Sequence, residues 1–295
     1  MKKFKGIGLL LLGNILIFIT LSISFTVLSE YVLPVFFGID LRGSIAQQDL
    51  LWSFVIGFGG AFISLAFSKQ MARMFIDCTQ ITEPRTQSEM MLYETVQKIS
   101  AKLDITMPEV WIYESPDPNA FATGPSKNNS MVAVSTGLMS HLNEGEVRAV
   151  IAHEMGHVYN GDMFTTTVLA GLMNTFVYFI SRMVARNVGD RNPMLYFATY
   201  IFLQIILSVL AMIPIGWWSR RREFAADRFA ANTVGSQYMI AALEGIDRWV
   251  QRTQFQYESQ DALATMKISG QSQSFMQLFS THPPIEDRIA ALRQL

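Results

Sequence analysis

Four stretches of this sequence carry no charged residue, and each is about as long as a membrane-crossing helix. A helix that crosses the hydrocarbon core of a bilayer needs about 20 predominantly apolar residues. The four candidate spans are residues 7–28, 50–68, 163–181 and 194–218. The chain is therefore predicted to be mainly α-helical, with about four transmembrane helices and the lipid bilayer as a partner.

The composition agrees with a membrane protein and excludes several other classes. Only 16% of the 295 residues are charged, compared with about 25% in an ordinary soluble domain. The net charge of −1 gives no sign of a nucleic-acid partner. The lone cysteine excludes a disulfide framework and a cysteine-ligated zinc finger. Any metal site must therefore use carboxylates and some of the four histidines.

The spans divide the chain into membrane and polar segments. The first span is predicted to be a retained anchor, because its apolar core exceeds the roughly 7–15 residues of a signal peptide. The polar segments are predicted to form one α+β domain with a small sheet. It has amphipathic helices at 87–103 and from 144 to about 160, and strands at 110–113 and 131–135. The predicted parts are an N-terminal hairpin (1–68), a first polar part (69–162), a second hairpin (163–219) and a second polar part (220–295).

Basic residues predict which side of the membrane the polar domain occupies. Lysines precede the first span and Lys69 and Arg73 follow the second, whereas the loop between these spans is net acidic. Positive charge favours the cytoplasmic side, so both ends of the first hairpin are predicted to be cytoplasmic. The loop between the third and fourth spans departs from this rule, because it carries Arg182, Arg186 and Arg191.

The segment His153-Glu-Met-Gly-His157 has the spacing of a metal site on a helix. Residues four apart share one helix face, so both imidazoles can bind one ion. In the H-E-x-x-H arrangement the two histidines bind zinc and the glutamate, here Glu154, acts as general base. The alternative is a helix with two surface histidines. The apolar residues 150–152 disfavour it, because they indicate a buried helix.

A third ligand is predicted in the segment after the fourth span. Catalytic zinc typically has three protein ligands and leaves one position for water. Glu223 can complete the site, and Asp227, one helical turn later, can accept a hydrogen bond from a ligand imidazole. The alternative is a juxtamembrane charge ladder with Arg228. Because His157 and Glu223 must meet at one ion, the chain between them must cross the membrane twice or not at all. The two apolar stretches favour two crossings, with the site facing the cytoplasm.

Two further elements are predicted to act on a peptide substrate. His282 precedes two prolines and is a candidate catalytic donor to the oxyanion of the tetrahedral intermediate; the alternative is a surface histidine. The second predicted strand is a candidate edge strand that pairs with an extended peptide. Its residues are Met131, Val132, Ala133, Val134 and Ser135.

These motifs together resemble the M48 family of zinc metallopeptidases, in particular the HtpX-type membrane proteases of bacteria. The resemblance includes the two hairpins, His153–His157, Ser219–Asp227 and Ser280–Arg288, and Asn119–Gly124 is similar to the family's loop before the active-site strand. It implies a zincin-like domain with one Zn²⁺ per subunit. It further implies an endopeptidase of the bacterial inner membrane that cleaves misfolded or damaged membrane proteins in a stress response.

Two alternative functions remain open from the residues. One is a membrane scaffold with a structural metal, which would need a fourth protein ligand such as His282 in place of water. The other is a CAAX-type processing protease. That branch has more spans enclosing a large chamber, so four apolar stretches disfavour it.

Overall fold

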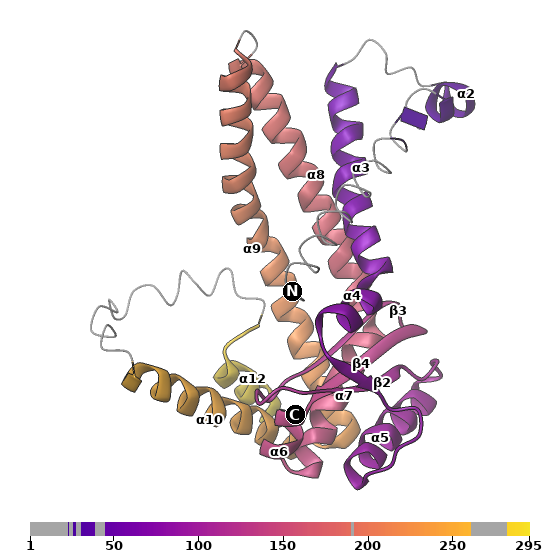
Figure 1. Ribbon diagram of the computed structural model, residues 1–295, viewed down its shortest axis with the longest axis vertical. Coiled ribbons are helices and arrows are strands. Elements are labelled where there is room, and N and C mark those ends of the chain that lie inside the picture. The colour runs from indigo at the N-terminus through magenta and orange to yellow at the C-terminus, as the bar shows by residue number, and fades with distance from the viewer. Residues whose placement is uncertain (1–22, 24–25, 28–30, 39–44, 190–191, 261–281) are drawn as a thin grey trace, which may run out of the picture. The chain divides into compact units, whose positions relative to one another are not determined.

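The computed structural model describes residues 23, 26–27, 31–38, 45–189, 192–260 and 282–295. The described residues form two compact units (Figure 1). The apolar unit comprises the described parts of 1–64 and 167–213, and the polar unit comprises those of 65–166 and 214–295. Each unit therefore contains two separate segments of the chain.

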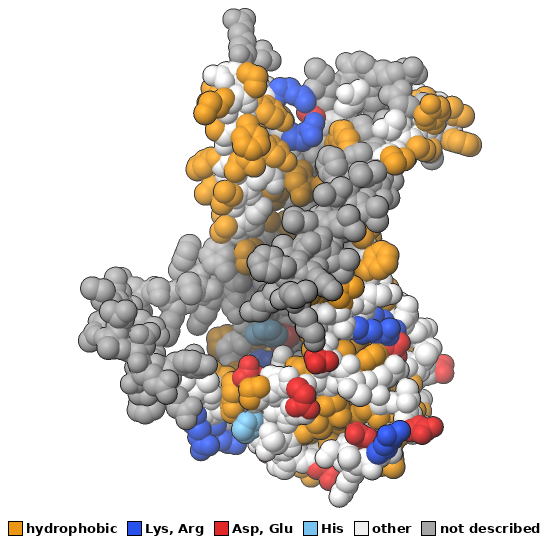
Figure 2. Space-filling view, viewed as in Figure 1, with side chains coloured by type: hydrophobic (Ala, Val, Ile, Leu, Met, Phe, Trp, Pro, Cys, Tyr) orange, Lys and Arg blue, Asp and Glu red, His pale blue; other side chains and the backbone are white. Residues whose placement is uncertain are grey.

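Three long helices supply the apolar unit. They are α3 (Ile45–Ala66), α8 (Asp162–Gly189) and α9 (Pro193–Val234), and a short helix α2 (Leu33–Phe37) precedes them. Within the described part of the chain, these three are the helices long and apolar enough to cross a membrane. Hydrophobic side chains cover much of their visible surface (Figure 2). The three later predicted spans overlap these helices, and the first, 7–28, lies almost entirely outside the described residues.

An ion-pair cluster around buried Asp49 includes two of the three arginines noted between the third and fourth predicted spans, and the third, Arg191, lies outside the described residues. Asp49 on α3 is buried, and its carboxylate lies 3.0 Å from Arg182 and 2.7 Å from Arg186, both on α8. Charged side chains are visible among the hydrophobic ones of this unit (Figure 2). Asp49 therefore offsets part of the positive charge at this end of α8. Asp49 lies 133 positions before Arg182 and 137 before Arg186. Counting charges along the sequence therefore could not pair these residues.

The polar unit contains a four-stranded mixed sheet. Its strands are β1 (Cys78–Gln80), β2 (Glu109–Tyr113), β3 (Ala120–Ser126) and β4 (Asn129–Ser135), in the order β1-β2-β4-β3. Strands β2 and β4 are parallel, and the other two pairs are antiparallel. The small sheet among predominantly helical elements confirms the predicted fold class.

The prediction that residues 131–135 form an edge strand is wrong. Strand β4 pairs with β2 on one side and with β3 on the other. Its residues 130–135 are all buried, and a continuous apolar run of this kind is typical of a strand covered on both faces. The edge strands are β1 and β3, and β3 includes most of the segment 119–124 that was expected to be a loop.

Helices cover both faces of the sheet. On one face, Val132 and Val134 of β4 pack against α5 (Gln87–Leu103) and α7 (Glu144–Asn160). The short helix α6 (Thr136–His141), together with α10 (Ser236–Gln260) and α12 (Ile285–Leu292), completes this side of the unit. On the other face, Trp111 and Met131 lie in a smaller cluster that includes Ala72 of α4 (Ser68–Phe75). Burying each large apolar side chain contributes about 1.5–3 kcal/mol.

Local sequence signals fix the ends of α7. Asn143 accepts a hydrogen bond from the Glu146 main chain, and the Glu146 side chain accepts one from the Asn143 main chain, which forms a capping box. The helix ends at Gly161, which has a φ of 68° that favours glycine. The capping box and Gly161 therefore define the two ends of the helix that carries both histidines of the motif.

Candidate metal centre

Two imidazoles from α7 face each other at the centre of the site. His153 and His157 lie one turn apart, and their Nε2 atoms are separated by 3.2 Å. His153 is buried and His157 is half-buried. Two ring nitrogens that converge in this way are suited to bind a common cation.

Glu223 of α9 completes a group of three donors. Its Oε1 lies 3.3 Å from Nε2 of His157, and its Oε2 lies 3.7 Å from Nε2 of His153. Among the described residues, this is the one group of three His, Cys or carboxylate ligands whose donor atoms lie within 4.8 Å of one another. Zinc-to-nitrogen bonds of 2.0–2.1 Å in a tetrahedron place ligand atoms about 3.4 Å apart. The donor types and the three separations therefore fit a zinc ion.

A glycine allows the two ligand-bearing helices to approach. A Cβ atom at Gly156 would lie 3.2 Å from Cα of Ala226 and 3.2 Å from the ring of Phe229. Ala226 is buried and stands three residues after Glu223. Small residues on both helices thus let α9 carry its carboxylate to the imidazoles of α7.

Each imidazole also contacts a carboxylate through its other nitrogen. Asp227 Oδ1 lies 2.9 Å from His153 Nδ1, a close approach that lacks the alignment of a full hydrogen bond. Asp162 Oδ2 forms a 2.7 Å hydrogen bond with His157 Nδ1. Carboxylates in this position orient the ring and fix which nitrogen faces the metal. Both contacts leave Nε2 directed at the group of three donors.

Two arginines hold these carboxylates in turn. Arg288 of α12 donates hydrogen bonds to both oxygens of Asp227, and its Nη1 lies 3.1 Å from Glu223. Arg222 forms an ion pair with Asp162. Sequence reasoning missed Asp162 and the role of both arginines. The sequence did contain an indication of the role of Arg288. A charged residue on the apolar side of a short C-terminal helix needs a buried carboxylate partner.

The charges of the site shift the pKa values of its ligands. Burial lowers the pKa of His157, but hydrogen bonds to Asp162 and Glu223 raise it to about 10. Burial raises the pKa of Glu223, but hydrogen bonds from His157 and His282 bring it far below its usual range. In the metal-free protein, His157 is therefore protonated at neutral pH beside an ionised Glu223. A metal ion must displace that proton.

Glu154 lies between the metal group and the edge strand. Its side chain is half-buried, and burial raises its pKa although the neighbouring imidazoles of His153 and His157 oppose the shift. The main chain of Ala122 on β3 forms a hydrogen bond with the carboxylate. A carboxylate with a raised pKa beside two metal-binding imidazoles can accept and return a proton.

The structure brings His282 to the site, whereas residues 131–135 form a central strand of the sheet. Nδ1 of His282 lies 3.0 Å from Oε2 of Glu223, although its side chain is 68% exposed. A role as oxyanion donor stays a prediction. The residues of β4 are buried between neighbouring strands, so their main chains are already paired and cannot bind a peptide.

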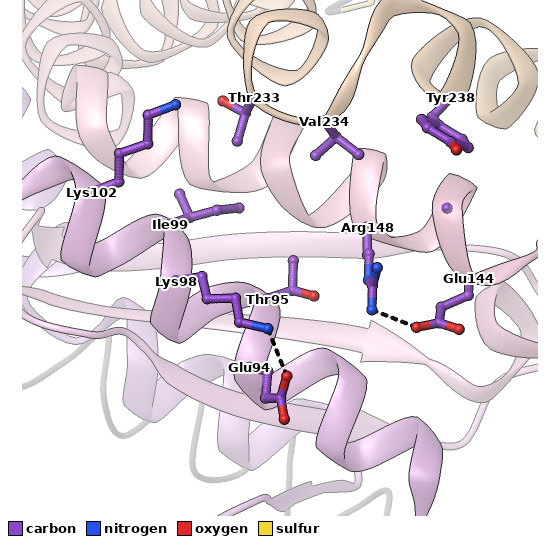
Figure 3. A pocket seen from close by; sticks show the side chains of 11 residues that line it. Glu94, Thr95, Lys98, Ile99, Lys102, Glu144, Arg148, Thr233, Val234 and Tyr238 are labelled. Atoms are coloured by element: carbon purple, nitrogen blue, oxygen red, sulfur yellow. Dashed lines mark hydrogen bonds and ion pairs between the residues drawn. The ribbon is translucent and has the colours of Figure 1, made fainter.

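A cavity of about 550 Å³ lies elsewhere in the polar unit (Figure 3). It is lined by α5 and α7, the end of α9 and the start of α10, and it contains none of the three donors. Two of its three basic side chains form ion pairs, Lys98 with Glu94 at 2.8 Å and Arg148 with Glu144 at 2.5 Å, and the third is Lys102. This cavity is therefore not part of the candidate metal centre.

Two histidines and a glutamate on two helices, beside a small sheet, define a metalloprotease of the H-E-x-x-H class. The profile of Peptidase family M48 matches residues 86–295, and the chain belongs to this family. It is 43% identical over 293 residues to Protease HtpX of Yersinia enterocolitica, covering 92% of this chain and 98% of the relative. Protease HtpX of Yersinia pestis (strain Pestoides F) gives the same values.

A solved structure shares the fold. The crystal structure of S. mikatae Ste24p aligns with a TM-score of 0.62, covering 93% of this chain and 67% of that protein, at 17% sequence identity. At this identity the likeness concerns the fold alone. The family match and the relatives confirm the family predicted from the motifs.

Proposed function

We propose that this protein is a zinc-dependent endopeptidase embedded in a membrane. The observation that carries the proposal is the convergence of His153, His157 and Glu223 within 4.8 Å of one another. Three protein donors are the number typical of catalytic zinc, whereas structural zinc sites have four. When bound there, zinc would polarise the scissile carbonyl and lower the pKa of a water molecule.

The residues of the chain supply the proton transfers. Glu154 takes a proton from the attacking water and later returns it to the departing amine. The hydrogen bond with Ala122 holds this carboxylate in place beside β3. His282, at the rim of the site, donates a hydrogen bond to the oxyanion that forms during attack. Its contact with Glu223 supports this position.

The edge strand β3 is the proposed docking site for substrate. It is the outer strand of the sheet on the side of α7, and Ala122 connects it to Glu154. An extended peptide that pairs with a sheet edge is held through its main chain, so many sequences are accepted. Such tolerance suits the cleavage of misfolded or damaged proteins.

The proposed location is the bacterial inner membrane, with the site facing the cytoplasm and misfolded membrane proteins as substrates. Three apolar helices support the membrane. Lys69 and Arg73, directly after α3, favour the cytoplasmic side. Pairing of Asp49 with Arg182 and Arg186 reduces the charge that would oppose this orientation. A role in the stress response follows from this substrate class.

Activity and metal content of the purified full chain test the proposal. We expect one zinc per chain, cleavage of an unfolded casein-like protein, loss of cleavage with a chelator and recovery on adding zinc. A chain that keeps one zinc and cleaves nothing would indicate a structural metal in a scaffold. Cleavage confined to prenylated C-terminal peptides would indicate a CAAX-type protease. Either result would overturn the proposal.

A further inference from the structure

Helix α4 has its charged and apolar faces reversed relative to a helix on a water-facing surface. It spans Ser68–Phe75, and Phe67 is its N-cap residue. The Lys69 side chain is only 12% exposed, whereas Met74 is 60% and Phe75 is 56% exposed. On a soluble protein the long basic side chains lie in water and the apolar ones pack inward. In α4 the basic side chains are instead the less exposed ones, 12% for Lys69 and 38% for Arg73.

The basic face is occupied by the catalytic sheet. Lys69 Nζ lies 2.8 Å from both Glu109 of β2 and Asn129 at the start of β4. Arg73 forms an ion pair with the same Glu109, and its guanidinium lies 5.0 Å from the ring centre of Trp111. These contacts fix the rotation of α4 about its axis, so the exposure of the opposite face does not come from a loose helix.

The outward face is a narrow apolar stripe, which we call the α4 stripe. At about 100° per residue, its members fall within an arc of about 100°, opposite Lys69 and Arg73. The stripe consists of Phe67, Met71, Met74 and Phe75, all of them exposed. A contiguous exposed apolar surface of this kind marks an interaction site rather than a random surface feature.

The position of α4 in the chain identifies what covers the stripe. One residue, Phe67, separates α4 from the end of α3, whose segment Gln47–Ala66 is apolar enough to cross a membrane. A helix that starts where a span ends starts at the membrane–water boundary. A strongly amphipathic helix at this boundary lies in its plane, with its apolar face about 5–10 Å into the headgroup and acyl region.

We infer that α4 is an in-plane interfacial helix whose stripe inserts into the lipid bilayer, while Lys69 and Arg73 bind it to the catalytic sheet. The inference rests on the membrane embedding in the proposed function. Its consequence is that the sheet, including the edge strand β3, is held directly against the lipid surface. Substrate segments that emerge from the bilayer would therefore meet β3 as they leave the lipid.

Site-directed fluorescence in lipid nanodiscs tests the inference. Cys78 is the single native cysteine, so Cys78→Ser gives a background for Met74→Cys, labelled with bimane. Met90→Cys is a matched control, because Met90 is also an exposed methionine (45%) but lies on α5. Leu172→Cys on the apolar helix α8 reports membrane embedding itself. The discs contain phosphatidylethanolamine and phosphatidylglycerol, with or without lipid that carries a nitroxide, placed near the headgroup for Met74→Cys and Met90→Cys and deep in the acyl chain for Leu172→Cys.

We expect the nitroxide lipid to quench the Met74→Cys label at least about twofold, because the label lies in the headgroup and acyl region. The Met90→Cys label should be unaffected. Quenching at Leu172→Cys without quenching at Met74→Cys would overturn this inference alone. A blue-shifted but unquenched Met74→Cys label would also overturn it, and would show that protein covers the stripe. Absence of quenching at Leu172→Cys would instead refute the membrane embedding.

A functional readout uses the double variant Met71→Gln/Met74→Gln, with Met90→Gln as control. We expect the double variant to cleave a membrane-anchored substrate several-fold more slowly and a soluble peptide at the original rate. Equal rates on the anchored substrate would contradict the inference. Because the three metal donors lie on α7 and α9 and none lies on α4, loss of both activities would also count against it.

Discussion

The guanidinium of Arg288 binds the carboxylate of Asp227 through two parallel hydrogen bonds. They measure 2.7 Å from Nε to Oδ2 and 2.6 Å from Nη2 to Oδ1, and join helices α12 and α9. Burial raises the pKa of Asp227, but the hydrogen bonds from Arg288 and the contact with His153 lower it overall. Asp227 is therefore ionised, and it contacts His153 because a distant C-terminal helix holds it there.

Removing this arginine should weaken metal binding. We expect Arg288→Met to lower zinc affinity about 10–100-fold, the usual effect of losing a partner of a ligating histidine, and Asp227→Asn to act similarly. Arg293→Met is a matched control at the end of the same helix, because its contact with Glu244 is long and exposed. Competition with a chromogenic chelator measures the affinities. Equal affinities for Arg288→Met and Arg293→Met would show that Arg288 only stabilises the fold.

Replacing Glu154 should separate chemistry from metal binding. Glu154→Gln keeps the size of the side chain but cannot accept a proton, so we expect unchanged zinc content and an activity lower by about 10²–10⁴-fold. Glu144→Gln, at the exposed start of the same helix, is the control. Metal analysis and cleavage of an unfolded substrate are measured on the same samples. Full activity in Glu154→Gln would refute the assignment of the general base.

Zinc affinity should rise with pH. Burial lowers the pKa of His157, but its hydrogen bonds to Asp162 and Glu223 raise it to about 10, so the metal-free imidazole carries a proton below that pH. Metal binding needs the neutral ring, so the bound proton competes with zinc. For one released proton we expect affinity to increase about tenfold per pH unit between about pH 7 and 9.

The variant Asp162→Asn provides the control for this linkage. It removes a carboxylate that raises the pKa of His157, so its pH dependence should be flatter than that of the unchanged protein. Titrations with a competing chelator at several pH values give both slopes. Affinity that does not change with pH in the unchanged protein would contradict a protonated His157.

The close contact at Gly156 predicts that a larger side chain there increases the distance between α7 and α9. Gly156→Leu places a side chain against Ala226 and Phe229, so α9 must move away from α7. We expect a destabilisation of about 1–3 kcal/mol from overpacking, with weaker zinc binding because Glu223 moves with α9. Gly60→Leu is the control, since no atom lies within 4 Å of a Cβ there. Thermal unfolding and zinc affinity are the measurements, and equal values for both variants would contradict this reading.

Much of the metal centre could be predicted because its chemistry is local in sequence. His153, Glu154 and His157 could be assigned from their spacing on a helix alone, because residues four apart share one helix face. Glu223 followed from the need for a third donor and the absence of usable cysteine. These steps depend on spacing and ligand chemistry rather than on tertiary packing, and the structure brings the three donors together.

The remaining features depend on contacts that the sequence does not encode locally. The apolar run 131–134 suits any half-buried or buried strand, and only its pairing with β2 and β3 makes it central. The segment that became β3 was expected to be a loop only from the family resemblance, and its Gly124 and Pro125 are uncommon in strands. Arg288 lies 61 residues from Asp227, so no periodicity connects them.

The most direct test of the metal centre is X-ray absorption at the zinc edge of the full chain and of Glu223→Ala. We expect the unchanged protein to bind one zinc with two imidazoles and oxygen ligands at about 2.0–2.2 Å, and Glu223→Ala to lose most of its zinc. Full zinc occupancy in Glu223→Ala, or three imidazoles around the metal in the unchanged protein, would contradict the site described by His153, His157 and Glu223.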